Sequence, residues 1–556
     1  MKFLSSFPFH TFLLAATTVL SSIVQVTHEV LPEEMVPPLI LMELYALVVY
    51  LLAYFCFKNS KKAGIAASFI VVLTLCFEQF RNILTQACQM ALHFDLPDIV
   101  AFILFWALVF GALALIFAKP KVTAELDQQG VDEKVKAQFD RMHIAFNIMC
   151  AIVLALNVVP LAISEYEQAQ TQNQQVAAFN QPFADLKLDN KVAKPDVYYF
   201  ILDAFAAHDT LKELGKFDNS EFIADLEKKG FYVVKRARSN YDRTPFSISS
   251  SLNMQYIDAV PRELGKNYVA DNVFYRLIQN SPVFRIFKKL GYQLVNVSSG
   301  SFATDNIPMA DRNLHVNFGN HFTTCMMMLT PMLGLEKYFP IMGEAYCQRR
   351  LAPKFLLPEI VKMPGPKFVM VHTDLPHPPS LFDENGKRLP LPRELLNDNS
   401  IDMASYVAQL KYCQKEVKAW VELLQAQPVQ PIIIVQSDHG LYYPRPNSKE
   451  YFNEVMRIIN AYYLPPVISV NDKARKDSEP YPTITPVNTF RVILNKYFAA
   501  GLPLLPDQSF CSSVRTSPYD WSEVSGELTF SAPLADDKAG DKDAASKSTS
   551  TTSSTR

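Results

Sequence analysis

Long apolar runs fill the first 165 residues of the chain. Five of them cover approximately residues 8–27, 36–57, 63–80, 96–118 and 142–163. Each run is close to the ~20 residues that a helix needs to cross a bilayer. The pattern therefore predicts a multi-pass α-helical membrane domain with five spans over residues 1–164. Because four further runs follow it, the first run is interpreted as a span and not as a cleaved signal peptide.

The charges between these runs predict an orientation. Basic residues follow the second run at Lys58, Lys61 and Lys62, and five more lie between the fourth and fifth runs. The other loops are acidic or nearly neutral. Since basic loops stay in the cytoplasm, an odd number of spans places everything after about residue 165 on the opposite side. We therefore expect a cell (inner) membrane protein whose soluble part is extracytoplasmic, or periplasmic where a second membrane exists.

The remainder of the chain has the pattern of a soluble domain. Residues 165–194 are rich in Gln, Asn and Ala and predict a linker, and residues 534–556 contain no apolar anchor and predict a disordered tail. Between them, over residues 195–533, apolar strand-like runs alternate with helical patterns, which predicts a mostly parallel sheet covered by helices. The expected strands are 197–203, 231–235, 292–297, 367–372 and 431–437. The expected helices are 219–229, 272–290, 403–426, 450–460 and 486–499.

Composition narrows the class of protein. The chain has 556 residues and a net charge of −2, so it needs more than one domain and has no excess positive charge for binding nucleic acid. Four of its eight cysteines lie in the soluble part, where oxidation is allowed. They permit three pairings, of which Cys325–Cys347 is the preferred one. The alternative is that all four are unpaired.

Two apolar runs have the pattern of strands that are buried on both faces, and both end in acidic residues. The apolar run from Val197 stops at Asp203, and the run from Ile432 stops at Asp438-His439-Gly440. In an open α/β sheet, chemistry gathers at the carboxyl ends of such strands. Carboxylates and an imidazole at one sheet edge predict a divalent-metal site, with Gly440 allowing a sharp backbone turn. The alternative for Asp203 is a helix N-cap.

A hydroxyl-rich segment follows the second expected strand. It contains Thr244-Pro245-Phe246-Ser247 and continues into a run of serines. A hydroxyl beside a divalent cation is easier to deprotonate and can act as a nucleophile. Thr244, near the start of a predicted helix, would also gain from the helix dipole. Composition cannot choose between Thr244 and Ser247, and an ordinary Ser/Thr-rich cap is the alternative.

Two histidines follow another apolar strand. His372 and His377 lie at its end, the latter in a proline turn, where they could bind an anion or serve as a general acid. An ordinary surface role is the alternative. His208, His315 and His321 have weaker contexts, and we expect them to be structural.

The order of these motifs resembles the alkaline phosphatase superfamily. A strand-ending Asp, a Thr in a hydroxyl-rich turn, an HxxxxHxP segment and a strand ending in Asp-His-Gly occur in that order. Five spans before the soluble domain resemble its membrane-anchored, sulfatase-like branch, which includes lipoteichoic acid synthases and phosphoglycerol and phosphoethanolamine transferases. The resemblance implies an α/β/α sandwich of alkaline phosphatase type. It also implies metal ligands, namely Asp203, Thr244, Asp438 and His439.

The same resemblance implies roles in catalysis. Thr244 would be the nucleophile, and His372 and His377 would contact the substrate. The sequence departs from the family pattern at two points, and these limit the reaction and the number of metal ions that we expect. The chain lacks the C/S-x-P-x-R motif from which sulfatases make formylglycine. It also has no histidine after His439, where two-metal members use one. One divalent ion (Mn²⁺, Mg²⁺ or Zn²⁺) is therefore expected.

The function implied is transfer of a phosphoryl-bearing head group. The donor would be a membrane phospholipid, the group would be of phosphoglycerol or phosphoethanolamine type, and the intermediate would be a phospho-threonine. The acceptor would be an extracytoplasmic glycan or lipid. Two alternatives stay open: a phosphodiesterase or phosphatase that uses water as acceptor, and a degenerate, non-catalytic binding module.

Overall fold

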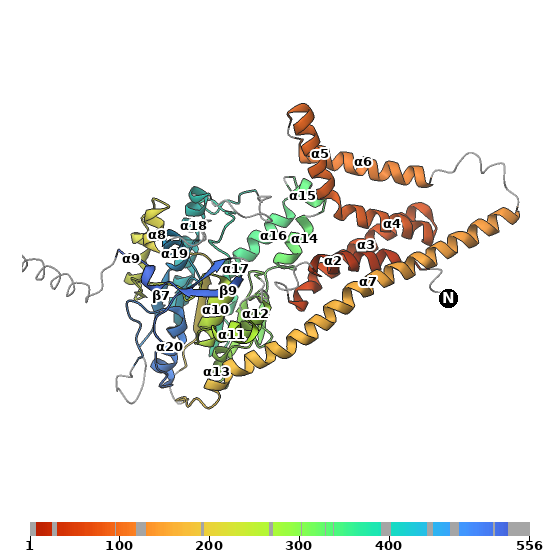
Figure 1. The fold of residues 1–556 in the computed structure, drawn as a ribbon. Helices are drawn as coiled ribbons and strands as arrows, with labels where there is room; N and C mark the ends of the chain where they lie inside the picture. The colour runs from red at the N-terminus through yellow and green to blue at the C-terminus, as the bar shows by residue number, and fades with distance from the viewer. Residues whose placement is uncertain are drawn as a thin grey trace, which may run out of the picture. The chain divides into compact units, whose positions relative to one another are not determined.

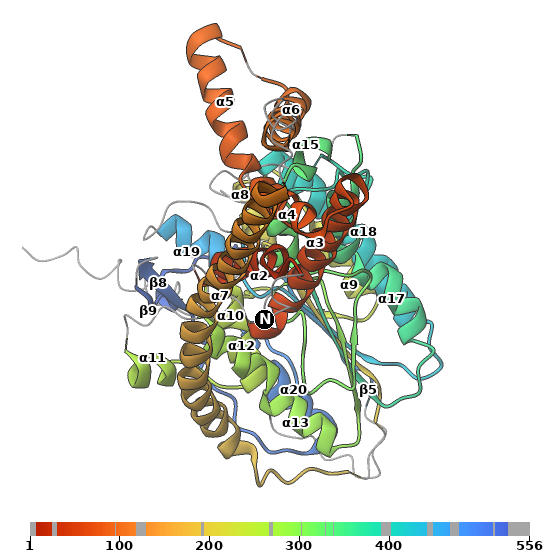
Figure 2. The ribbon, with the colours of Figure 1, turned by 90° about the vertical axis from the view of Figure 1, so that its right-hand side faces the viewer.

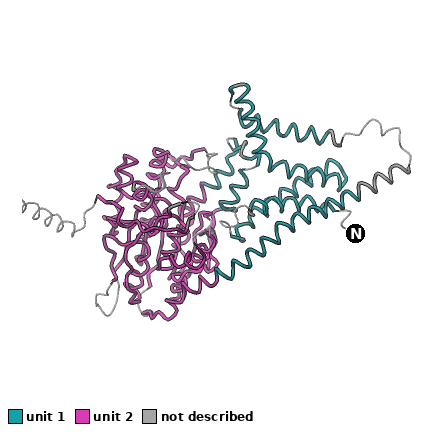
Figure 3. Tube along the Cα trace, in the orientation of Figure 1, with its two compact units in different colours: residues 1–172, 317–346 teal, residues 173–316, 347–556 magenta. Residues whose placement is uncertain are grey.

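The computed structural model divides into two compact units. Unit 1 comprises residues 1–172 and 317–346, and unit 2 comprises residues 173–316 and 347–556 (Figure 3). The structure describes residues 7–24, 31–94, 96–117, 129–190, 194–265, 271–301, 303–328, 330–336, 338–390, 402–441, 449–466, 477–514 and 517–531. The predicted tail lies outside these residues.

Unit 1 is helical, and its elements follow the apolar runs of the sequence (Figure 1). Its first helices are α2 (Phe9–Val24), η1 (Pro32–Met35), α3 (Val36–Phe57), α4 (Ser60–Leu75), α5 (Phe77–Leu92), α6 (Asp98–Phe117) and α7 (Gln129–Asn180). Many apolar side chains on these helices face outward; Leu52 and Phe55 are 63% and 72% exposed. Outward apolar faces are what a helix needs when lipid surrounds it.

Among the described residues, fewer helices than apolar runs have the length and apolarity that a membrane crossing needs. Two helices, Glu33–Phe57 and Asp140–Phe183, are long and apolar enough to span a bilayer. The third predicted span is not one straight helix, because α4 and α5 meet at a bend of 56° and would together make a third crossing. Phe9–Ser22 and Asp98–Ala114 are shorter apolar helices. The helical membrane region is present, and the count of five spans stays a prediction.

Polar contacts hold three of these helices together. The His10 ring nitrogen Nδ1 lies 2.6 Å from Ser68 Oγ, and its backbone N–H donates to Asn147 Oδ1 at 2.8 Å. The Thr11 hydroxyl donates to the Gly64 carbonyl at 3.0 Å. A Cβ on Gly64 would lie 2.1 Å from Pro8, so only glycine allows this approach. Small residues and interhelical hydrogen bonds are the usual means of joining helices in a membrane.

Unit 2 is built on a seven-stranded sheet with the order β2-β7-β6-β1-β5-β3-β4. The strands are β1 (Val197–Leu202), β2 (Tyr232–Val233), β3 (Gln293–Val297), β4 (Arg312–Leu314), β5 (Lys367–Thr373), β6 (Ile432–Gln436) and β7 (Asn460–Tyr463). The pairs β6–β1, β1–β5, β5–β3 and β3–β4 are parallel. Strand β7 runs antiparallel to both of its neighbours in this sheet, β2 and β6. The mostly parallel sheet was predicted.

Helices cover both faces of this sheet. On one face Phe200 of β1 stacks on Trp420 of α18 (Met403–Gln425) at 5.6 Å, and α17 (Ala352–Ile360) packs beside it. On the other face Tyr199 meets Phe490 of α20 (Thr489–Phe498) at 5.1 Å. Because consecutive strand residues point to opposite faces, these contacts define three layers (Figure 2). The α/β/α sandwich is therefore present.

The other elements of unit 2 refine the expected boundaries. The helices are α8 (His208–Glu213), α9 (Ser220–Lys228), α10 (Thr244–Asn253), α11 (Ala259–Leu264), α12 (Asn272–Gln279), α13 (Pro282–Lys289) and α19 (Lys449–Met456), with short helices η3 (Gln181–Phe183), η5 (Pro486–Asn488) and η6 (Ser525–Glu527). A hairpin of β8 (Phe510–Val514) and β9 (Ser517–Glu523) follows. The expected helix 272–290 is two helices, because Pro282 starts a new one. Residues 165–180 of the expected linker continue α7.

Candidate metal centre

Three neighbouring parallel strands bring the predicted site residues to one edge of the sheet. Asp203 directly follows β1, and Asp438 follows β6 by two positions. His372 is the penultimate residue of β5, where it pairs in register with Ile201. Since β6, β1 and β5 are adjacent and parallel, their carboxyl ends must meet.

Hydrogen bonds tie the two acidic strand ends to each other. The Ser437 hydroxyl lies 2.6 Å from the Leu202 carbonyl and accepts from the Phe205 N–H at 2.9 Å. Asp438 Oδ1 accepts from the Ala204 N–H at 3.3 Å. Ala204 has a left-handed φ of 57°, and the Tyr406 hydroxyl donates to its carbonyl at 2.7 Å. The turn after Asp203 is therefore held from two sides.

These supports were not found from the sequence. Ser437 is adjacent to a predicted ligand, so its position carried some signal. Tyr406 lies on α18, about 200 residues from Asp203, and no local pattern marks it. The same turn excludes the alternative of a helix N-cap at Asp203, because the next helix, α8, begins at His208 with Ala207 as its N-cap.

The side chains at this edge converge on His439. Its Nε2 atom lies 3.5 Å from Asp203 Oδ1, 3.6 Å from Asp438 Oδ2 and 3.2 Å from Thr244 Oγ1. Its other nitrogen, Nδ1, lies 2.8 Å from the Gly440 carbonyl and therefore carries the proton in the neutral ring. The Nε2 lone pair then points at two carboxylate oxygens and a hydroxyl. Burial lowers the pKa of His439, but the charges of Asp438 and Asp203 raise it above its ordinary value, so without a cation the ring favours a second proton on Nε2. A bound cation would take the place of that proton.

The distances fit a small four-coordinate cation. Ligand atoms 2.0–2.1 Å from a tetrahedral ion lie about 3.3–3.4 Å from one another. The three distances around His439 span 3.2–3.6 Å. The carboxylate distances are also too long for direct N–H···O hydrogen bonds, which require about 2.7–3.2 Å. The distances from His439 Nε2 to Asp203, Asp438 and Thr244 are thus compatible with a shared cation, whereas the group whose ligand atoms all lie close to one another is Asp203, His372 and Asp438. The four predicted ligands stay a prediction.

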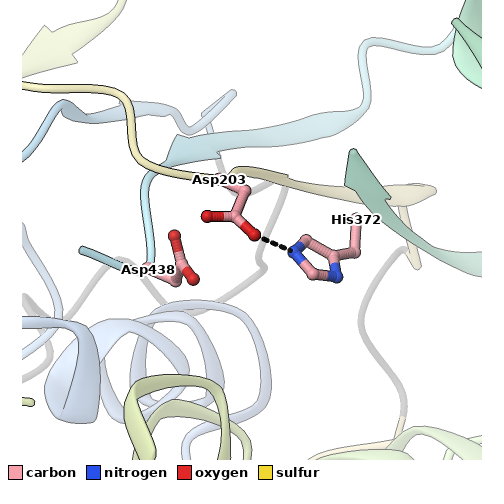
Figure 4. Close-up of side chains that lie close together, drawn as sticks. All are labelled: Asp203, His372 and Asp438. Atoms are coloured by element: carbon pink, nitrogen blue, oxygen red, sulfur yellow. Dashed lines mark ion pairs between the residues drawn. The ribbon is translucent and has the colours of Figure 1, made fainter. Parts of the chain in front are cut away.

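Unsatisfied polar atoms mark the same place. Among the described residues, Asp203 Oδ1, Asp438 Oδ2 and His372 Nε2 are buried and have no hydrogen-bond partner. Asp203, His372 and Asp438 also offer ligand atoms that all lie within 4.8 Å of one another (Figure 4). Leaving such atoms buried and unpaired costs about 1–3 kcal/mol each, and more when the group is charged. A bound cation would remove that cost.

The charges at the site shift one another's pKa values. Burial would raise the pKa of Asp203, but the charge of His377, the contact with His372 and the charge of His439 lower it below its ordinary value. Burial and the charge of Asp203 raise the pKa of Asp438. Two carboxylates in one buried site therefore repel each other, and a divalent cation would relieve the repulsion.

The structure separates the two candidate nucleophiles. Thr244 is the first residue of α10, so its hydroxyl lies at the positive end of that helix and faces His439. The Ser247 side chain is fully buried, and its hydroxyl donates to the Asp438 carbonyl at 2.6 Å. Ser247 thus binds the backbone of a predicted ligand, and of these two hydroxyls only that of Thr244 faces His439.

The two predicted substrate histidines occupy different environments. His377 is half-buried, and its ring centroid lies 6.3 Å from that of His439. His372 is completely buried behind Asp203; its Nε2 lies 3.5 Å from Asp203 Oδ2, and its Nδ1 lies 2.7 Å from Thr304 Oγ1. A completely buried ring cannot meet a substrate directly. Of these two rings, the structure thus leaves that of His377 open to a substrate, and the roles of both histidines stay predictions.

The other histidines of unit 2 have local partners, as expected. His208 Nδ1 lies 2.6 Å from Asn219 Oδ1, and His315 Nε2 lies 3.1 Å from the Asp305 carbonyl. Two thiols of unit 2 also have local contacts: Cys413 Sγ donates to the Leu375 carbonyl, and Cys511 Sγ to Asp242 Oδ2. The Cys325–Cys347 bridge stays a prediction.

Replacing His372 should weaken metal binding. Its Nε2 lies 3.5 Å from Asp203 Oδ2 and is one of the three ligand-type atoms grouped at the site. Loss of a residue that supports a metal ligand costs about 10–100-fold in metal affinity. We expect His372→Ala to raise the dissociation constant for Zn²⁺ by that factor, as measured by competition with a chromophoric chelator. His208→Ala serves as the matched control and should bind Zn²⁺ as the unmodified protein does. Equal affinities in the two variants would remove this role from His372.

Gly440 is required for a different reason from the one predicted. Its φ is not left-handed, so a sharp turn is not what demands glycine. Instead, a Cβ at this position would lie 2.3 Å from the Glu454 carbonyl oxygen and 2.6 Å from that of Arg457. We expect Gly440→Ala to reduce the free energy of unfolding by about 1–3 kcal/mol. Gly526→Ala, where nothing lies within 4 Å of an added Cβ, is the control and should change it by less than ~0.5 kcal/mol in urea titrations.

Comparison with known proteins gives a weak overall likeness. No family model and no curated protein matches the chain. Among solved structures, the C-terminal periplasmic domain of EcEptC from Escherichia coli in complex with Zn is 13% identical; the match covers 58% of this chain and 86% of that one, with a TM-score of 0.37. Integral membrane lipooligosaccharide phosphoethanolamine transferase A from Neisseria meningitidis is 11% identical over 82% and 88%, with a TM-score of 0.32.

A 2-O GAG sulfatase is also found, 11% identical over 60% of this chain and 75% of its own, with a TM-score of 0.35. Phosphoethanolamine transferases and sulfatases are the groups that the sequence resemblance names. Because every one of these TM-scores is below 0.5, the function of this chain has to be argued from its own residues.

Proposed function

We propose that the protein is a membrane-anchored, metal-dependent transferase of phosphoryl-bearing head groups. The single observation that carries the proposal is a group of four ligand-type atoms, namely His439 Nε2 and the three oxygens around it, with both carboxylate oxygens unsatisfied. One of the four is a hydroxyl at a helix N-terminus, which is the group that a phosphoryl transfer needs as nucleophile.

Zn²⁺ is the ion that we propose for this centre, with Mn²⁺ and Mg²⁺ as the alternatives. The separations of 3.2–3.6 Å match a tetrahedral ion at about 2.0–2.1 Å. An octahedral Mg²⁺ site would instead hold adjacent ligand atoms about 3.0 Å apart and prefers oxygen to imidazole nitrogen. When bound, a divalent ion lowers the pKa of a coordinated hydroxyl and neutralises charge on a non-bridging phosphate oxygen.

The residues of the chain then perform a two-step transfer. Thr244 Oγ1 loses its proton to water and attacks the phosphorus of a phospholipid head group. A bond forms between Thr244 and phosphorus, and the bond to the diacylglycerol oxygen breaks. His377, half-buried beside His439, donates a proton to the departing oxygen.

In the second step an acceptor hydroxyl on an extracytoplasmic glycan or lipid attacks the same phosphorus. The Thr244–phosphorus bond breaks, His377 takes up the acceptor's proton, and Thr244 Oγ1 regains from water the proton that it lost in the first step. Both residues are then in their starting states. The apolar helices of unit 1 suit this reaction, because they keep the chain in the membrane that contains the donor.

Head-group transfer in reconstituted vesicles tests this function. The full chain with Zn²⁺ is placed in vesicles whose phosphatidylethanolamine or phosphatidylglycerol carries a labelled head group, with and without a lipid-linked glycan. We expect diacylglycerol release and label on the acceptor. Label released only as the free head-group phosphate would support the hydrolase alternative, and no turnover of either lipid would support the non-catalytic alternative.

A further inference from the structure

One segment of the soluble domain belongs structurally to the helical unit. Residues 317–346 group with residues 1–172 in unit 1, although the chain belongs to unit 2 up to residue 316 and again from residue 347 (Figure 3). The segment contains α14 (His321–Met328), α15 (Met332–Leu335) and the start of α16 (Ile341–Arg350). We call it the 317–346 insertion. Nothing in the apolar pattern of the sequence predicted it.

The insertion packs on the apolar helices at specific points. Helix α14 contacts α3, and α15 contacts α6. Asn320 is 1% exposed, and its side-chain amide donates to the Glu34 carbonyl at 3.0 Å. Glu34 lies in η1, just before α3, and the acidic charge of this connection between the first two apolar runs predicts that it faces away from the cytoplasm. The insertion is therefore joined to the outer end of a helix long enough to cross a membrane.

The insertion exposes far more apolar surface than the soluble unit does. Its outward large apolar side chains are Phe318 (58%), Met332 (39%), Tyr338 (55%), Phe339 (63%) and Ile341 (60%). In the described part of unit 2, a much longer stretch of chain, the only comparable side chains are Tyr232, Phe355 and Val429. Aromatic residues gathered at the end of membrane helices are typical of the membrane–water interface, and such a density is unusual on a surface that faces water.

We propose that the 317–346 insertion is a membrane-interface element whose exposed side chains lie among the lipids of the outer leaflet. The partner is a phospholipid bilayer, because the patch is continuous with helices that carry lipid-facing apolar surfaces of their own. Buried polar residues of the insertion hold its backbone from the protein side. The Glu336 carboxylate accepts from the Met342 and Gly343 N–H groups at 3.1 and 2.9 Å, directly beside the exposed Ile341. The apolar residues are thereby left to face outward.

Quenching by brominated lipids tests this inference without reference to catalysis. Phe339→Trp is made in a Trp106→Phe background, which removes the native tryptophan of a candidate apolar helix, and the full chain is reconstituted in phosphatidylcholine vesicles. Acyl chains brominated near the head group should reduce the fluorescence gained from Phe339→Trp at least about twofold. Phe355→Trp on α17, where the native side chain is 49% exposed in unit 2, is the matched control and should lose little fluorescence.

Two results would overturn the proposal. If Phe339→Trp responds to brominated lipid no more than Phe355→Trp and is accessible to iodide in water, the patch is an ordinary exposed surface. If it is shielded from both quenchers, a protein or a second copy of the chain covers it. Either result leaves the proposed transferase function untouched, because the measurement involves neither Thr244 nor the metal.

Discussion

Thr244→Ala should abolish head-group transfer while leaving the fold intact. Its hydroxyl is the one nucleophile-type group that faces His439, and no neighbouring hydroxyl can replace it, since Ser247 is buried and donates to a backbone carbonyl. Loss of a covalent nucleophile removes the reaction path itself, so we expect transfer to fall by at least ~10³-fold in the vesicle assay. Thermal unfolding should be nearly unchanged, because Thr244 is partly exposed.

The neighbouring residues provide the controls for this prediction. Thr244→Ser keeps the hydroxyl and should retain measurable transfer. Ser247→Ala leaves the nucleophile in place and should transfer head groups, although it loses a buried hydrogen bond worth about 0.5–1.5 kcal/mol of stability. Undiminished transfer by Thr244→Ala, or loss confined to Ser247→Ala, would show that the nucleophile is misassigned.

Removing the metal should stop transfer and lower the thermal stability of unit 2. Without a cation, Asp203 and Asp438 are buried side by side, and the pKa of Asp438 rises because its ionised form is disfavoured. A ligand present at 100 times its dissociation constant stabilises a protein by about 2.7 kcal/mol. We expect chelation to lower the unfolding temperature correspondingly, and added Zn²⁺ to restore both stability and transfer.

Single-ligand variants make this prediction specific. Asp203→Asn and Asp438→Asn remove a negative charge from the site, so their unfolding temperatures should no longer respond to Zn²⁺. Asp438→Asn relieves the carboxylate repulsion and should be no less stable than the metal-free unmodified protein. Asp203→Asn also loses the favourable interactions with His377, His372 and His439, so it should be less stable than the metal-free protein. A stability gain from Zn²⁺ that persists in both variants would place the metal elsewhere in the molecule.

Much of this candidate site could be predicted from the ends of the apolar strands, because a buried strand is recognised from a short, local stretch of sequence. A continuous apolar run identifies a buried strand, and in a parallel sheet its last residue must lie at the edge where Asp203 and Asp438 are found. The choice between Thr244 and Ser247 depends on which way two side chains of one helix point. That direction is set by the packing of α10 on α12 and α13, which lie further along the chain.

The complete burial of His372 was not predicted, for a related reason. A shift of one residue in strand register decides whether a side chain lies at the carboxyl edge of the sheet or inside the sheet. His372 pairs with Ile201, two residues before Asp203, so it lies inside the sheet. Strand β7 was missed because its four residues follow α19 almost directly. The expected helix 450–460 covered most of α19 and ended on the first residue of β7. The third apolar run likewise gave no sign of the bend between α4 and α5.

The most direct test of the central claim is the mass of the protein after it meets its donor without an acceptor. The full chain with Zn²⁺ is mixed with phosphatidylethanolamine or phosphatidylglycerol, quenched in acid and digested for mass spectrometry. The account predicts a phosphoethanolamine or phosphoglycerol group on the peptide that contains Thr244, absent from Thr244→Ala and from chelator-treated protein. An unmodified Thr244 in protein that releases diacylglycerol, or a group attached to another residue, would contradict it.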